Sequence, residues 1–193
     1  MNYLAHAFLS PEDPLILAGN LWGDLIRPKD YDALLPGLLD GIILHKKIDA
    51  FTDQHRGVDE IVKLIRPYQG KYTPVVADVL MDFILSKFWH MFHEKTIEDF
   101  CEHKYKQIAE HLHLIPLRLH PRINRMLENN WLESCKNREQ IKRTLYMLSN
   151  RASFENKMAE AMQPYDLHEH TMDRLFLTFF DDMRAYLILR SEG

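Results

Sequence analysis

The stretch 36-PGLLDGIILHKKIDAFTDQH-55 carries both the helical pattern and the polar residues from which the rest of the chain can be interpreted. Pro36 suits the first turn of a helix, where its missing N–H has no partner in any case. The apolar side chains that follow recur at helical spacing and predict a helix from Pro36 to about Phe51. They are Leu38, Leu39, Ile42, Ile43, Ile48 and Phe51.

The segments on either side of this stretch also have a helical period. Ser10-Pro11-Glu12-Asp13 has the pattern of an N-cap, with proline at the first helical position and an acid after it. Thr73-Pro74 opens the most apolar helix, which is expected to reach Trp89. Alternating strand patterns and Asn-Gly or Asp-Gly hairpin turns are missing. The sequence therefore predicts an all-α fold, a single compact multi-helix domain over 1–193, with further helices over 15–25, 96–114, 118–133, 138–150, 152–162 and 166–190.

Composition narrows the classes of function. The chain has 193 residues, of which 46% are apolar and 27% charged, and its formal net charge is −4. A mildly acidic chain is a poor candidate for binding nucleic acid, so no nucleic-acid partner is expected. No window approaches eighteen consecutive apolar residues, the two cysteines lack a CxxC spacing, and the first residues do not resemble a signal peptide. We therefore expect a cytoplasmic protein with no membrane segment.

One part of the chain is basic. Residues 102–143 contain nine Lys and Arg against five Glu, a local charge of +4. Such a stretch is typical of an ordinary solvated helical face, but it would also suit an acidic partner.

Polar residues interrupt the apolar faces at four places, and these are the candidate functional residues. His45, Asp49 and Asp53 are four residues apart and form one ridge, in which neighbours lie about 6 Å apart and two can hold one metal ion. The same ridge could also be an exposed face whose acids pair with lysines. Asp78 and Asp82 lie one turn apart on the most apolar helix, where their repulsion would push one of them toward protonation unless a cation, either a metal ion or a Lys or Arg, lies between them. The other two places are Asn20 with Asp24, and His6 among apolar neighbours.

Carboxylates and imidazoles without thiolates suit Mn²⁺, Mg²⁺ or Fe²⁺ better than a structural zinc ion. Such an ion most commonly activates water and binds a phosphoryl oxygen. Basic side chains close in sequence could bind phosphate: Arg27, Lys46, Lys47 and Arg56.

These residues together resemble the bacterial acyl carrier protein phosphodiesterases. The order and spacing of four blocks carry the resemblance, and weaker agreement continues through Ser149-x-Arg151, Tyr165-Asp166 and Phe176-x-x-Phe179. The four blocks are Met1-Asn2-Tyr3-Leu4-Ala5-His6; Gly19-Asn20-x-x-Gly23-Asp24-Leu25; Gly41-Ile42-x-x-His45-Lys46-x-Ile48-Asp49-x-Phe51-Thr52-Asp53-x-His55; and Asp78-Val79-x-x-Asp82.

The resemblance implies a helical fold similar to the HD superfamily of metal-dependent phosphohydrolases. It implies hydrolysis of the phosphodiester that joins 4′-phosphopantetheine to a serine of holo acyl carrier protein, with Mn²⁺ or Mg²⁺ as cofactor. Because acyl carrier protein is acidic, the resemblance also implies that the basic stretch 102–143 could bind it. The expected metal ligands are His6, Asp24, His45, Asp49, Asp53 and Asp78; the expected catalytic acids are Asp24, Asp49 and Asp82; and Asn20, Arg27, Lys46 and His55 are expected to contact phosphate or substrate.

The sequence departs from the family pattern at Phe83, where relatives usually have histidine, and phenylalanine can neither bind a metal nor carry a proton. Two alternative functions therefore stay open. One is an HD-like hydrolase of a nucleotide or another small phosphoester. The other is an inactive helical protein that binds acyl carrier protein.

Overall fold

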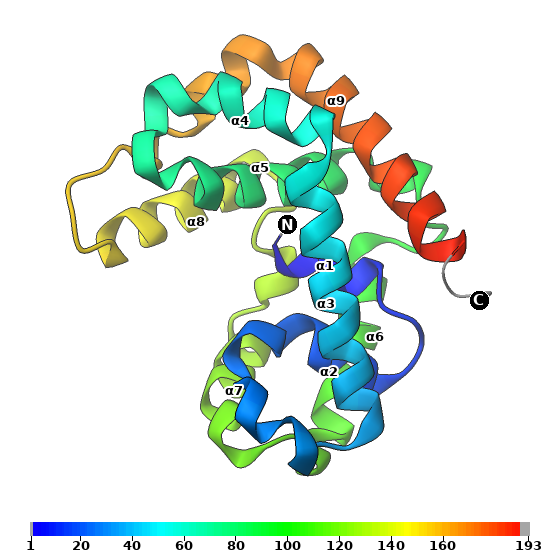
Figure 1. Ribbon diagram of the computed structural model, residues 1–193. Helices are drawn as coiled ribbons and strands as arrows, with labels where there is room; N and C mark the ends of the chain where they lie inside the picture. The colour runs from blue at the N-terminus through cyan, green and yellow to red at the C-terminus, as the bar shows by residue number, and fades with distance from the viewer. Residues whose placement is uncertain (1, 190–193) are drawn as a thin grey trace. The chain divides into compact units, whose positions relative to one another are not determined.

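A computed structural model describes residues 2–189 of the chain (Figure 1). Its regular elements are all helical and residues 2–189 contain no strand, so the all-α fold is confirmed. The described chain divides into two compact units. The first unit contains Tyr3–Asp49 and Trp89–Glu133, and the second contains Asn2, Ala50–Phe88 and the chain from Ser134 onward. The single domain over 1–193 and the HD-like resemblance stay predictions.

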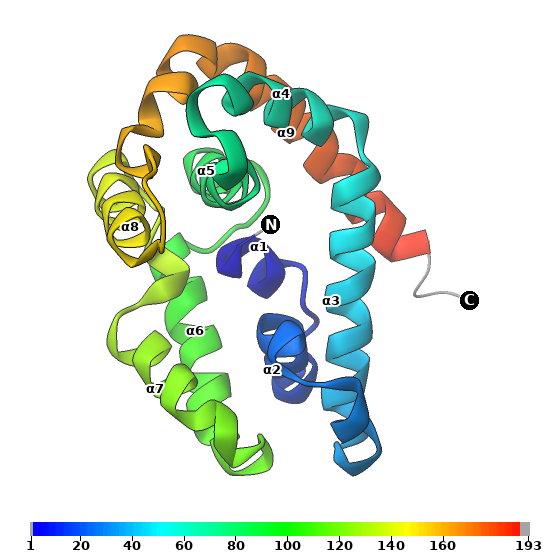
Figure 2. The same ribbon diagram turned by 60° about the vertical axis from the view of Figure 1, so that its left-hand side comes forward.

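The first unit holds every residue of the candidate site described below. Its helix α2 contacts α1 and α6, and the 3₁₀ turn at Trp131–Glu133 contacts α1, α6 and α7. Figure 2 shows α2 beside the N-terminal half of α3. The helices are α1 (Tyr3–Phe8), α2 (Pro14–Trp22), α3 (Pro36–Gln54) up to Asp49, α6 (Ile97–Glu110) and α7 (His120–Glu128).

Two glycines let α2 and α3 approach each other until their backbones touch. A Cβ atom on Gly19 would lie 2.2 Å from the carbonyl oxygen of Leu38, and one on Gly41 would lie 2.2 Å from that of Ile16. Real Cβ atoms do not come this close to a carbonyl oxygen, so only glycine fits at either position. This approach brings the last turn of α2 next to the middle of α3.

The second unit is built from α4 (Arg56–Gln69), α5 (Thr73–Lys87), α8 (Arg138–Arg151), α9 (Met162–Leu189) and the last turn of α3. Helix α4 packs along α9, and α5 contacts α4, α8 and α9. The apolar stripe of α9 is fully buried, at Phe176, Phe179, Phe180 and Met183. A polar network also links α5 to α9: Lys87 donates to Glu169 and Asp173, and the hydroxyl of Tyr165 donates to Asp173.

Several helix boundaries differ from the prediction. The cap of α2 is Asp13, whose carboxylate accepts from the N–H groups of Leu15 and Ile16, so the predicted cap at Ser10 is wrong. Helices α1 and α4 were not predicted. In place of the predicted helix 152–162, the only helical turn before α9 is a 3₁₀ turn at Met158–Glu160, and α7 is shorter than the predicted 118–133. The last predicted helix begins earlier, at Met162, and position 190 lies outside the described residues.

The basic stretch 102–143 is divided between the two units. Within the first unit Lys104 is buried, and its ammonium group donates to Glu12 at 2.8 Å. Arg122 donates to the hydroxyl of Tyr3 at 2.7 Å. These two side chains therefore have structural partners. Within residues 2–189, none of the helices combines the length and the apolar character that crossing a bilayer requires.

Candidate metal centre

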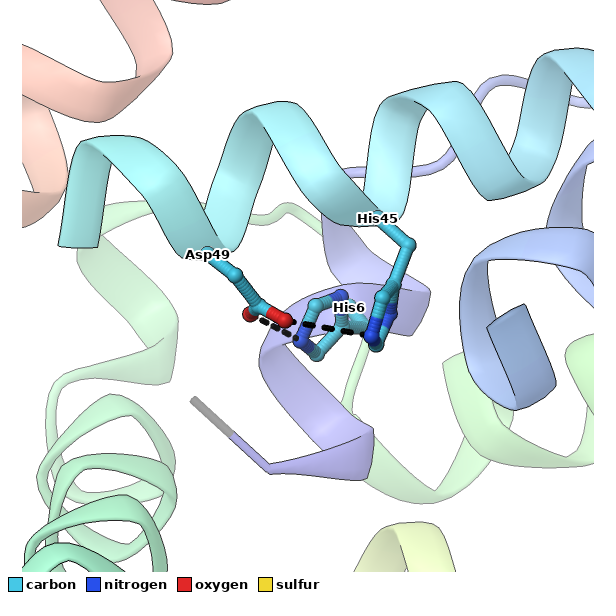
Figure 3. A group of neighbouring side chains, drawn as sticks. All are labelled: His6, His45 and Asp49. Atoms are coloured by element: carbon cyan, nitrogen blue, oxygen red, sulfur yellow. Dashed lines mark ion pairs between the residues drawn. The ribbon is translucent and has the colours of Figure 1, made fainter. Parts of the chain in front are cut away.

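Two histidines and an aspartate from α1 and α3 meet within the first unit (Figure 3). Nε2 of His45 lies 3.1 Å from Oδ2 of Asp49, one turn further along α3. Nε2 of His6 lies 3.4 Å from Oδ1 of the same carboxylate. The two imidazole rings stack with their centroids 4.6 Å apart. In the part of the chain that the structure describes, this is the one group of three or more His, Cys, Asp or Glu residues whose ligand atoms all lie within 4.8 Å of one another.

Asn20 orients both imidazoles. Its side-chain NH₂ donates to the carbonyl oxygen of His6 and to the hydroxyl of Ser10, so its Oδ1 is the atom that faces Nδ1 of His6 at 2.8 Å. Its backbone oxygen lies 2.7 Å from Nδ1 of His45. Because both facing atoms are acceptors, Nδ1 of each ring donates a hydrogen bond to Asn20, and Nε2 of each ring faces the centre.

The glycines of the first unit maintain this arrangement. The close approach at Gly19 and Gly41 places the Asn20 carbonyl beside α3, within hydrogen-bonding distance of His45. Gly23 follows the end of α2, and a Cβ there would lie 3.2 Å from two side-chain carbons of His45. A larger residue would press on the imidazole.

The charges of the three residues favour a cationic ligand. Burial lowers the pKa of His6, which is therefore a neutral imidazole at neutral pH. Burial also opposes charge on His45, but the carboxylates of Asp49 and Asp24 outweigh burial and raise its pKa. Burial would raise the pKa of Asp49, but the two histidines lower it well below its ordinary value. Asp49 is thus an ionised carboxylate between the Nε2 atoms of two histidines.

Nε2 of His45 provides the test of whether these residues fit a metal ion. The atom is buried and lies 3.1 Å from carboxylate oxygens of both Asp24 and Asp49, yet it makes no well-formed hydrogen bond. A buried nitrogen without a hydrogen bond is costly in a protein. A cation bound at this point would be coordinated by that nitrogen and balanced by the carboxylates. The residues present therefore fit a divalent ion.

Asp24 joins this group from a more open position. It lies in the 3₁₀ turn Gly23–Leu25 directly after α2, and 79% of its side chain is exposed. It is therefore the carboxylate of the group that a large substrate can reach. Of the residues predicted from sequence, the structure brings together His6, Asn20, Asp24, His45 and Asp49.

Two of the predicted basic residues of the first unit have other partners. Arg27 pairs with Asp30 at 3.2 Å, and the ammonium group of Lys46 lies 5.1 Å from the centre of the Tyr31 ring. Both residues are exposed, and their contact with phosphate stays a prediction.

The remaining predicted residues belong to the second unit. Asp53 lies on the last turn of α3, and Asp78 and Asp82 lie on α5. His55 caps α4, where its Nδ1 accepts from the N–H of Gly57, and its Nε2 lies 3.1 Å from Asp182. Their roles in the site stay predictions. Phe83 is buried and packs edge-on against the ring of Tyr165.

The sequence interpretation missed the role of the glycines and of the Asn20 backbone. The family blocks contain Gly19, Gly23 and Gly41, but their spacing does not show which backbone or side chain each of them approaches. Gly19 and Gly41 both lie inside helical segments. Glycine at such a position is a recognisable signal, because it costs stability and usually marks close packing.

Comparisons with known proteins address the family of the chain. The sequence profile of the family "Acyl carrier protein phosphodiesterase" matches residues 1–183. A protein of that name from Yersinia pestis is 29% identical over 184 residues, 95% of each chain. Another from Yersinia enterocolitica is 29% identical over 186 residues, 96% of each chain, and one from Enterobacter sp. (strain 638) is 28% identical over 184 residues, 95% of each chain. No solved structure matches the chain significantly. Because the family profile covers almost the whole chain, the protein belongs to the acyl carrier protein phosphodiesterase family.

Proposed function

We propose that this protein hydrolyses the phosphodiester bond between 4′-phosphopantetheine and a serine of holo acyl carrier protein. The products are the apo carrier protein and free phosphopantetheine. The observation that carries the proposal is the His6–His45–Asp49 group, in which Asn20 directs both Nε2 lone pairs to one point. Membership of the family supplies the substrate.

We propose that this point binds a divalent cation, Mn²⁺ or Mg²⁺, with Fe²⁺ as a further candidate. His6, His45, Asp49 and Asp24 would hold it, a set of two nitrogens and two carboxylates that suits Mn²⁺ or Fe²⁺ best. A bound ion of this kind supplies an activated water and positive charge for a phosphoryl oxygen.

The protein side chains have separate tasks in this proposal. Asn20 fixes the tautomers of His6 and His45, so that neither ring presents an N–H to the ion. Asp49 stays ionised because of the two histidines beside it. Asp24 is exposed, so its carboxylate can accept a proton from water next to the bound phosphodiester.

We also propose that this reaction takes place in the cytoplasm. Cys101 and Cys135 are both reduced and buried, which supports the cytoplasm, where thiols remain reduced.

The direct test is incubation of the protein with holo acyl carrier protein and Mn²⁺, followed by mass spectrometry of the carrier. We expect the carrier to lose the mass of phosphopantetheine. Asp24→Ala and Asp49→Asn should remove this turnover, whereas Asp59→Asn, an exposed carboxylate on α4, should keep it.

Two results would contradict the proposal. Cleavage of nucleotides or other small phosphoesters with an unchanged carrier mass would support the HD-like alternative. Carrier binding without turnover, with Asp24→Ala leaving the affinity unaltered, would support an inactive binding protein.

A further inference from the structure

The first unit contains an apolar groove that the proposed reaction does not use. Its volume is about 370 Å³, within the range of small-ligand sites. Three of its leucines are exposed, Leu35 by 42%, Leu114 by 37% and Leu117 by 80%, and contiguous exposed apolar side chains of this kind mark binding surfaces. The groove is lined by eight apolar residues, Ala33, Leu34, Leu35, Leu38, Leu114, Ile115, Pro116 and Leu117, together with Asp30 and Arg118.

The two charged residues of the groove pair with each other, and Asp30 also pairs with Arg27. The guanidinium of Arg118 lies 3.0 Å from Oδ2 of Asp30, and its other terminal nitrogen donates to the carbonyl oxygen of Leu25 at 3.0 Å. Both charges are therefore paired, and the side chains of the lining provide little else for a polar ligand. The chemistry of the groove suits a flexible hydrocarbon.

The groove lies close to the candidate metal centre in the same unit. Leu38 and His45 are seven residues apart on α3, so they share a face of the helix and are separated by roughly 10 Å along its axis. Leu34 and Leu35 come before Leu38, so the groove extends along the chain away from His45. Leu25, which Arg118 holds, directly follows Asp24.

We propose that this groove binds the acyl chain of an acylated carrier protein, attached as a thioester to the phosphopantetheine arm. This inference rests on the proposed function. With the phosphodiester at the His45 centre, an extended arm is long enough to span the two helical turns to Leu38. The thioester then comes next to the groove, where the chain is removed from water.

The experiment compares the KM for holo carrier protein with that for octanoyl carrier protein. We expect the wild-type KM to be about tenfold lower for the octanoyl form. Leu117→Glu places a charge on the groove and should reduce the KM ratio to about one. Leu167→Glu is the matched control, because Leu167 is a similarly exposed leucine of the second unit, and it should keep the wild-type ratio. Circular dichroism and the oligomeric state of each variant are measured alongside.

Binding of octanoyl-pantetheine, followed by calorimetry, separates this inference from the proposed function. Binding to the wild type but not to Leu117→Glu would support the groove even if holo carrier protein were not cleaved. Equal KM values for the two carriers in the wild type would overturn the inference. An equal rise of both KM values in Leu117→Glu would instead place the carrier protein itself in the groove. A change from dimer to monomer would place a second copy of the chain there, and either result would overturn the acyl site.

Discussion

Asn20 is the residue that links α1, α2 and α3 at the site. It is fully buried, and its side chain holds His6 and Ser10 while its backbone holds His45. Support of this kind behind metal ligands normally affects the affinity for the metal, because it fixes the tautomer and the direction of the lone pair.

We expect Asn20→Ala to weaken Mn²⁺ binding by about 10- to 100-fold, because Nδ1 of His6 loses its acceptor. The loss of the buried hydrogen bonds should also lower the free energy of unfolding by about 1–3 kcal/mol. Calorimetric titration with Mn²⁺ and urea unfolding measure the two effects.

Asn156→Ala is the control for this prediction. Asn156 also makes side-chain hydrogen bonds to the backbone, but it lies in the second unit. The variant Asn156→Ala should lower the free energy of unfolding without changing the affinity for Mn²⁺. An unchanged affinity in Asn20→Ala would show that Asn20 does not position the ligands.

The contact of α2 with α3 depends on two glycines, and their replacement should lower the free energy of unfolding. In Gly19→Ala the new methyl group would meet the carbonyl oxygen of Leu38 at 2.2 Å, so the helices must separate. Overpacking of this kind typically costs about 1–3 kcal/mol. Because backbone atoms cannot rotate away, we expect the upper end of this range and a weaker affinity for Mn²⁺. Urea unfolding and Mn²⁺ titration measure both effects.

Gly37→Ala is the matched control on α3. Its Cβ would meet the side chain of Leu15 at 2.9 Å, and a side chain can move. A smaller loss of stability and an unchanged Mn²⁺ affinity are expected. An equal loss in the two variants would contradict the special role of Gly19.

The elements differ in how well the sequence predicted them. The apolar period of 36–51 and the Thr73-Pro74 start were sufficient for α3 and α5, because both helices have long buried faces. Helix α1 has only six residues, and its packing on α2 stabilises it, so no local pattern could reveal it. At 152–162 the chain around Asn156 instead forms side-chain-to-backbone hydrogen bonds that compete with a helix.

The helical spacing of the sequence also predicted part of the candidate site. The spacing of four residues identified His45 and Asp49 on one ridge. Their meeting with His6, which lies 39 positions before His45, depends on tertiary packing that spacing does not encode. The same ridge extended to Asp53, but that residue lies on the last turn of α3, which belongs to the second unit.

Binding of a divalent ion should raise the free energy of unfolding of the protein. A ligand at about 100 times its Kd adds about 2.7 kcal/mol of stability. We therefore expect Mn²⁺ to raise the Tm by several degrees and a chelator to reverse the rise, as measured by differential scanning fluorimetry. His45→Ala should abolish the response and Asp59→Asn should retain it. A Tm that is indifferent to both Mn²⁺ and chelator would count against the site.

Acid stability should depend on Glu12. Partial burial opposes its ionisation, but Lys104, His103 and Gln107 outweigh this and lower its pKa to about 2. A carboxyl group with a lowered pKa stabilises the fold above its ordinary pKa of 4.5, and this contribution disappears as the pH falls towards 2. Because 67% of the Glu12 side chain is exposed, solvent screening reduces the contribution.

Glu12→Gln should therefore be less stable than the wild type at pH 7, and the difference should shrink between about pH 4.5 and pH 2. Urea unfolding across this pH range measures it. Glu60→Gln, an exposed partner of Lys63, is the control and should change stability less. A difference that does not vary with pH would contradict the assignment.

Neither unit is one continuous segment of the chain, and this affects how the protein is made on the ribosome. His6, Asn20, Asp24, His45 and Asp49 all emerge early, within the first 49 residues. Besides α1 and α3, the helix α6, Ile97–Glu110, packs on α2, and the first unit ends only at Glu133. Residues 50–88 must therefore be translated before the first unit can be completed, and a ribosome stalled earlier would hold these five residues without the helix that packs on α2.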